Sequence, residues 1–291
     1  MQQIKPGIYF EDQHLGVTLG ALVYSHGTVL IDAPLRPEDA RSWRSGLLSQ
    51  RGGIGRLLVL LDAHPDRSLG ARSLESTILV HQETAQKFSD RSIIFKGQVE
   101  VSGAIWETYH EAIGTRWAPP DITFSEQMTL HWGGPEILLE HHPGPAPGAT
   151  WVLIPEEKVV FIGDAVITDR PPFIANGDLD KWIDTLQLLN KSYKDYTIIG
   201  GRNGLVTIED IRAQIRFSKK VVSRLERLAE KNAPPDETEK FISTLLSSYE
   251  IPADKYARCA QRLRNGLFQY YNNHYFLPQN SEVDLNNYSP Y

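Results

Sequence analysis

An apolar run at residues 57–61 that turns polar within one residue is the feature that most constrains how this chain folds. The run predicts a strand buried on both faces, as in a sheet with packed layers on either side. Pro65 and Gly70 then stop the strand and permit a tight turn. Polar groups at the carboxyl end of a buried strand are typical of the sites of open α/β folds; the alternative is a turn in which Asp62 and Asp66 cap a helix. The polar residues are Asp62, His64, Asp66 and Arg67.

Two later strands also end in polar residues. A predicted hairpin over residues 151–166 has a second strand that is apolar almost up to Asp164. A carboxyl group in that place is poorly solvated, so it needs a cation, amide donors or a proton. The apolar strand 197–199 is followed closely by Arg202. We expect these strand ends and the loop 143–148 to form one site at the edge of a layered sheet.

Two other histidines have ordinary explanations. His81 ends a predicted strand at residues 78–81, where a hydrogen-bonded packing residue is the favoured interpretation and a ligand the alternative. His110 has helical spacing with Glu107 and Glu111 that suits a metal ion. A solvated helix face is the interpretation that we favour for this group.

Composition limits the classes of function. The 291 residues are 41% hydrophobic and 23% charged, which is ordinary for a globular protein. The net charge of -6 argues against a general nucleic-acid binder, because such proteins carry an excess of Lys and Arg. Cys259 is the only cysteine, so any metal has to rest on His, Asp and Glu. The sequence has no signal-peptide core and no apolar run of about 18 residues, so we predict a cytoplasmic protein without a membrane segment.

The order and the residue patterns of the polar loops resemble those of the metallo-β-lactamase superfamily. That family carries HxHxDH after a buried strand, a PGHTPG-like loop, a GD after a strand and a GH in a later loop. The corresponding stretches are DAHPDR at 62–67, PGPAPG at 143–148, Gly163 with Asp164, and Gly201 with Arg202. The resemblance covers roughly residues 5–206 and implies an α/β fold, a four-layer αββα sandwich of two mixed sheets with a metal site along one edge.

The resemblance also implies a role for each motif position. Asp62 stands where the family has its first histidine, while His64 and Asp66 are retained. Asp164 keeps the place of the acid that bridges two metals. The places of the three other family histidines are held by Arg67, Pro145 and Arg202. His64 is thus the one family histidine that remains.

These replacements do not suit a pair of metal ions. A dinuclear hydrolase needs two cations about 3.5–4 Å apart. Pro145 has no side-chain donor, and Arg67 and Arg202 stay protonated and therefore have no usable lone pair. Their guanidinium groups can instead pair with Asp66 and Asp164. We predict that salt bridges replace the second metal.

Three functions from different classes remain open, so whether the chain is an enzyme is open as well. The first, which we favour, is a cofactor-free pseudoenzyme or non-classical relative whose cleft, lined by Arg67 and Arg202, binds a small anionic molecule or a partner. The second is a hydrolase of ester, lactone, thioester or phosphoester bonds with one zinc or other divalent ion at Asp62, His64 and Asp164. The third is a nuclease-like member, which the acidic charge disfavours. A purely structural ion-pair network is the alternative for the whole cluster.

The last part of the chain predicts helices. Thr207 and Asp210 have the spacing of a capping box, and apolar residues at three-four spacing follow. Further helices are predicted at residues 236–249 and 253–271. We expect these helices to cover the mouth of the site or to form the surface of a homo-oligomer. The predicted division is a metallo-β-lactamase-like αββα domain at residues 1–206 and a C-terminal helical extension at residues 207–291.

Overall fold

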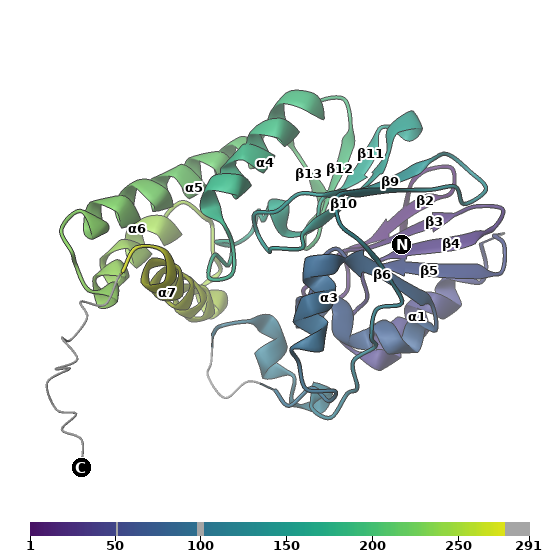
Figure 1. The fold of residues 1–291 in the computed structure, drawn as a ribbon, viewed down its shortest axis with the longest axis horizontal. Coiled ribbons are helices and arrows are strands. Elements are labelled where there is room, and N and C mark those ends of the chain that lie inside the picture. The colour runs from purple at the N-terminus through teal and green to yellow at the C-terminus, as the bar shows by residue number, and fades with distance from the viewer. Residues whose placement is uncertain (51, 98–101, 277–291) are drawn as a thin grey trace, which may run out of the picture.

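The computed structural model describes residues 1–50, 52–97 and 102–276. Among these residues the strands form two mixed sheets, and helices cover the outer face of each (Figure 1). The first sheet runs in chain order: β1 (Gln2–Lys5), β2 (Ile8–Glu11), β3 (Leu19–Val23), β4 (Gly27–Ile31), β5 (Gly55–Val59), β6 (Thr77–His81) and β7 (Ile122–Phe124). The second runs in the order β13 (Gly204–Val206), β12 (Thr197–Gly200), β11 (Val159–Phe161), β10 (Thr150–Ile154), β9 (Ile137–His141) and β8 (Gln127–Leu130).

Strand direction explains why the polar loops meet. In the first sheet β4, β5 and β6 are parallel, so their carboxyl ends lie at one edge. In the second sheet β10 and β11 form the predicted antiparallel hairpin, and β11 is parallel to β12. Ion pairs between the segments that follow β5, β11 and β12 show that these segments meet at one edge of the sandwich. Those segments carry DAHPDR, Asp164 and Arg202.

Three apolar layers hold the sandwich together. The inner layer lies between the sheets and contains Leu57, Val59 and Phe161. A second layer, which includes Trp43 and Leu58, packs the first sheet against α1 (Pro37–Leu47). The third packs the second sheet against helices that include α4 (Leu179–Ser192), with Trp182 fully buried in it. The predicted αββα sandwich is confirmed.

The C-terminal helices gather at one end of the molecule (Figure 1). Helix α5 (Ile208–Ala229) begins with the predicted capping box, because the Thr207 hydroxyl accepts from the Asp210 N–H and the Asp210 carboxylate accepts from the Thr207 N–H. The predicted helix at 236–249 is present in two shorter pieces: a 3-10 helix (Pro235–Phe241) leads directly into α6 (Ile242–Leu246). Helix α7 (Ala253–His274) follows.

The helical extension shares the apolar layer of α4 and the second sheet. Ile211 and Leu225 of α5 and Leu263 and Leu267 of α7 belong to it. The boundary at residue 206 stays a prediction, and residues 277–291 of the predicted extension lie outside the described residues. Of the helices within residues 1–50, 52–97 and 102–276, none combines the length and apolar character that crossing a bilayer requires.

Short helical segments complete the fold. Asp66 and Arg67 of the polar stretch lie on α2 (Pro65–Ser68), directly after the loop that follows β5. Helix α3 (Gln82–Ser89) follows β6. The 3-10 segments are Leu69–Leu74, Ile105–Thr108, His110–Ala112, Pro155–Glu157, Gly163–Ala165 and Pro235–Phe241.

Candidate functional site

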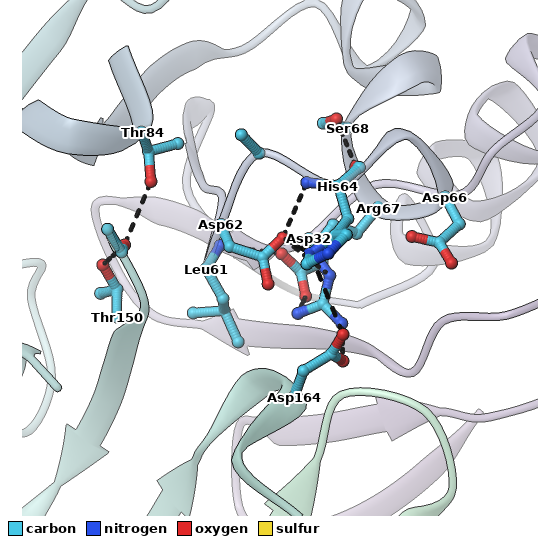
Figure 2. Close-up of polar contacts among 12 residues, drawn as sticks. Asp32, Leu61, Asp62, His64, Asp66, Arg67, Ser68, Thr84, Thr150 and Asp164 are labelled. Carbon is cyan, nitrogen blue, oxygen red and sulfur yellow. Dashed lines mark hydrogen bonds and ion pairs between the residues drawn. The ribbon is translucent and has the colours of Figure 1, made fainter. Parts of the chain in front are cut away.

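Arg67 is the centre of the polar cluster. Its side chain is 0% exposed and lies among three aspartates (Figure 2). Nη1 is 3.2 Å from Asp32 Oδ2, Nε is 3.4 Å from Asp62 Oδ1, and Nη2 pairs with Asp164 Oδ1. These carboxylates come from the ends of β4, β5 and β11. One cation thus joins segments of both sheets.

Arg202 forms the second ionic centre, from the turn between β12 and β13. Its Nε and Nη2 are 2.9 and 2.7 Å from Oδ1 and Oδ2 of Asp164. Its Nη1 pairs with Asp66 on α2 and donates to the carbonyl oxygen of Gly16 at 2.9 Å. The pairing of both arginines with carboxylates, which the sequence predicted, is therefore present.

His64 and Asp62 form a local unit beside Arg67. Asp62 Oδ1 lies 2.8 Å from both the backbone nitrogen and the ring Nδ1 of His64. In a neutral imidazole, a carboxylate at that distance favours the tautomer with the proton on Nδ1 and the lone pair on Nε2. Asp62 does not cap the next helix, because α2 begins after His64 and has no side-chain cap. The capping alternative for Asp62 is wrong.

Two motif glycines are required by the packing of Arg67. Gly163 has a φ of +55°, and a Cβ on Gly201 would lie 2.8 Å from Arg67 Nη2 and 2.8 Å from the Gly163 carbonyl carbon. Because Arg67 is enclosed and paired, it cannot move aside for a methyl group. The glycines before Asp164 and Arg202 are thus part of the ionic cluster.

The cluster shifts the acidity of its members in two directions. Burial alone would raise the pKa of Asp62, but Arg67 and His64 outweigh it and leave that pKa well below its usual range. Burial also opposes ionisation of Asp164, and Arg202 and Arg67 together lower its pKa. At Asp32 burial wins, because Arg67 offsets it only in part, and the pKa rises to about 7.

The charges of the cluster do not cancel. Each arginine carries one positive charge, and burial, which lowers an arginine pKa, is outweighed by the facing aspartates in both. The cluster therefore sets two positive charges against four carboxyl groups. The excess is negative, and a proton on Asp32 removes only part of it. The acids are Asp32, Asp62, Asp66 and Asp164.

The donor set does not fit two metal ions. Both oxygens of Asp164 already accept from guanidinium groups, and Pro145 offers no donor atom. A single ion has more support, because Asp62, His64 and Asp164 each offer one ligand atom and these atoms lie within 4.8 Å of one another. Such a set leaves a position open in a four-coordinate zinc site.

A pocket opens beside the cluster. His64, Pro145 and Trp182 contribute to its wall. The interpretation that Arg67 lines the cleft is wrong, since that side chain is fully buried behind the wall. The charged residues that line the pocket are Asp66, Asp164, Arg170, Arg202, Arg258 and Arg262.

The other histidine candidates have structural roles or none. His81 Nε2 is 2.6 Å from the Ser125 carbonyl oxygen and its Nδ1 accepts from the Glu83 N–H, so it is the packing residue that we favoured. His110 is exposed in a 3-10 turn. The Glu107 carboxylate accepts from backbone N–H groups at 102–104, so the alternative of a metal group with His110 finds no support within the described chain.

Sequence reasoning missed four residues of this region. Asp32 could have been found by the rule that singled out Asp62, because both follow buried strands. Arg170 lies in a loop, and Arg258 and Arg262 lie on α7. No local pattern states which face of a distant helix meets the site.

Comparison with known proteins assigns the family. The family model of the Metallo-beta-lactamase superfamily matches residues 22–201. The chain belongs to the metallo-β-lactamase superfamily. None of the curated proteins matches this member of the superfamily.

Three solved structures with the same fold cover different shares of this chain. A metallo-beta-lactamase family protein from Thermus thermophilus has 18% identity and a TM-score of 0.63, covering 90% of this chain and 93% of its own. The inverting sec-alkylsulfatase Pisa1 from Pseudomonas sp. has 16% identity and a TM-score of 0.67, covering 99% of this chain but 52% of its own. A metallo-beta-lactamase from Pontibacter korlensis has 15% identity and a TM-score of 0.57, covering 75% and 97%. At such identities the likeness concerns the fold alone.

Proposed function

We propose that this superfamily member is a non-classical relative that binds a small organic anion without a metal cofactor and does not carry out metal-dependent hydrolysis. The observation that carries this proposal is Arg67, a fully buried cation held by Asp32, Asp62 and Asp164. It stands at the family position of a ligand to the second metal. A guanidinium there supplies positive charge but cannot activate water.

Arg202 is the second arginine at a position where the family has a metal ligand. It binds Asp164 with two nitrogen atoms. Planar two-point pairs of this kind fix the position of a carboxylate more firmly than a single contact does. The two arginines thus provide the positive charge of a second metal in a form that holds the loops together.

The charge of the pocket supports an anionic ligand. Four arginines and two aspartates line it, so its charged groups have a positive excess. Three of these groups, Arg202, Asp66 and Asp164, also belong to the ionic cluster. A small organic anion is the partner that suits this wall. The cytoplasmic location, the absence of nucleic-acid binding and a homo-oligomer formed through the C-terminal helices remain further proposals.

A hydrolase with one metal ion is the second candidate. The proximity of Asp62, His64 and Asp164 favours it, and so does the negative excess of the cluster, which a divalent ion would offset. When bound, the ion would lower the pKa of a coordinated water. In that case Asp62, His64 and Asp164 would hold the ion, while Arg202 orients Asp164.

Metal analysis of the purified full chain separates the two candidates. The metal content is measured before and after incubation with zinc or manganese and removal of free ions. We expect well under one equivalent in both samples. One tightly held equivalent that is lost in His64→Ala and kept in His131→Ala would overturn the proposal in favour of the hydrolase. His131 is a suitable control because its side chain is 75% exposed.

A further inference from the structure

The four arginines of the pocket differ in how their charge is used. Arg202 is engaged by Asp66 and Asp164. Arg170 forms a two-point pair with its neighbour Asp169, with Nε and Nη2 at 2.8 and 2.6 Å from the two carboxylate oxygens. A carboxylate already neutralises each of these cations. They add little attraction for a further anion.

The two arginines of α7 have no such partner. Among the described residues, no carboxylate lies within 4.0 Å of the guanidinium of Arg258 or of Arg262. The two residues are four positions apart, so they share one face of α7. That face lines the pocket. The positive excess of the pocket therefore belongs to α7.

Arg262 is held in a defined orientation. Its guanidinium carbon lies 3.6 Å from the centroid of the Phe173 ring, and Nη1 donates to Ser102 Oγ at 3.0 Å. Ser102 Oγ in turn donates to Glu107 at 2.5 Å. A Cβ on Gly103 would lie 2.7 Å from the backbone nitrogen of Arg262, so the loop that contains Ser102 and Gly103 packs directly on α7. A cation fixed in this way loses little entropy when it binds a ligand.

The charge of Arg262 is also poorly hydrated. Burial lowers its pKa to about 10, so the group stays protonated at neutral pH although its ionised form has lost part of its solvation. An anion beside it would restore the missing interaction. Ionic hydrogen bonds are strongest where water is partly excluded.

The pocket wall also has apolar side chains. Ile105, Ile167, Pro171, Phe173 and Trp182 all contribute to its wall. The wall also carries Asp66 and Asp164, and the ionic cluster to which they belong has four carboxyl groups against two guanidiniums, so it would repel an anion. A ligand with one anionic group therefore binds with that group at the guanidiniums of α7.

We propose that Arg262, assisted by Arg258, is the anion-binding group of this pocket, and that the ligand is an amphiphilic organic anion. Its carboxylate, sulfate or phosphate group pairs with the α7 guanidiniums, and its apolar part lies against Ile167, Phe173 and Trp182. The C-terminal extension thus completes the binding site. This inference rests on the proposed function, since it names the ligand class of the same pocket.

Calorimetry on the full chain tests the inference. The probes are octanoate, octyl sulfate and octyl phosphate, with octanol and octyltrimethylammonium as neutral and cationic probes of the same chain length. We expect the unmodified protein to bind at least one anionic probe, and to bind octanol and octyltrimethylammonium at least about tenfold more weakly. The order of affinity among the anions identifies the head group.

Substitutions on α7 test which arginine binds the anionic group. Arg262→Ala is expected to weaken anion binding about tenfold or more, and Arg258→Ala by less. Arg264→Ala makes the same charge change on the same helix, where the side chain is 44% exposed and pairs with Glu239, and should leave binding unchanged. Arg262→Lys keeps the charge but loses the planar fork, so an intermediate loss is expected. Arg262→Lys is the variant that tests the inference if Arg262→Ala does not fold.

Other results of these experiments would contradict the inference. Anion binding that is unchanged in Arg262→Ala or Arg262→Lys would overturn the inference, and so would equal affinity for octanol or no binding of any anionic probe. The proposed metal-free function is judged separately by metal content. A protein that takes up one zinc and still needs Arg262 for anion binding would overturn that function and leave this inference in place.

Discussion

Arg202 and Asp164 form a two-point ion pair, with Nε 2.9 Å from Oδ1 and Nη2 2.7 Å from Oδ2. The pair joins the segments that follow the parallel strands β11 and β12. A further contact from Arg202 reaches Asp66, which follows β5 in the other sheet. Forming buried pairs costs desolvation, whereas removing one partner leaves an uncompensated charge. The cluster should therefore be sensitive to single substitutions.

Removal of the central cation should destabilise the protein strongly. Arg67→Met keeps much of the side-chain volume but leaves three buried carboxyl groups without their shared cation. We expect the free energy of unfolding to fall by about 3–5 kcal/mol. Urea unfolding followed by circular dichroism measures it. Arg227→Met, at an exposed position on α5, is the control and should change stability by less than about 0.5 kcal/mol. Equal stability of the two variants would contradict the role of Arg67.

Asp32 should give the free energy of unfolding an unusual pH dependence. Its native pKa of about 7 exceeds its ordinary value of 3.8, so between these values the native state binds more protons than the unfolded chain. Stability from this group is therefore full at low pH and falls as pH rises toward 7, by at most about 1.4 kcal/mol per pH unit. Asp62 and Asp164 act in the opposite sense, and their stabilisation is lost only as the pH falls below about 4.

Comparison with Asp32→Asn isolates this effect. The amide does not titrate, and its oxygen can keep the 2.9 Å hydrogen bond from the Leu61 N–H. The free energy of unfolding of the wild type minus that of Asp32→Asn should decline between about pH 5 and pH 7. A constant difference across this window would show that Asp32 is ionised throughout.

Local patterns predicted most of the scaffold. The apolar run at 57–61 correctly indicated a buried strand, although β5 ends at Val59. The hairpin of β10 and β11 and the capping box of α5 follow from turn and cap residues close together in the chain. Such features depend on neighbours in sequence, so a single sequence reveals them.

Long-range contacts limited the prediction of the site. The ion pair of Arg67 with Asp32 joins residues that share no motif. The full burial of Arg67 depends on how closely Gly163 and Gly201 pack around it. Likewise, the face that α7 turns toward the pocket depends on its packing in the apolar layer that it shares with α4, α5 and the second sheet. The sequence thus predicted the residue types at the strand ends, but not which of them the pocket exposes.

The glycine before Arg202 should be intolerant of a side chain. In Gly201→Ala the Cβ would meet both Arg67 Nη2 and the Gly163 backbone at 2.8 Å. We expect a loss of about 1–3 kcal/mol in the free energy of unfolding. Gly46→Ala is the matched control, because nothing lies within 4 Å of its Cβ on α1 and alanine favours a helix by up to about 1 kcal/mol. A similar effect of both changes would contradict the close packing around Arg67.

Restoring the lost ligands should create metal binding if the scaffold has kept the family geometry. The triple variant Arg67→His, Pro145→His and Arg202→His removes both guanidiniums and places imidazole nitrogens beside His64 and Asp164. Neutral imidazole is a zinc ligand, whereas guanidinium is not, so we expect the zinc content to rise to between one and two equivalents. Elemental analysis after zinc incubation measures this, and a triple variant with Gln at the same positions controls for the lost charges. Zinc content that stays at the level of the Gln control would mean that the loops have moved from the family arrangement and that the ion pairs now define their positions.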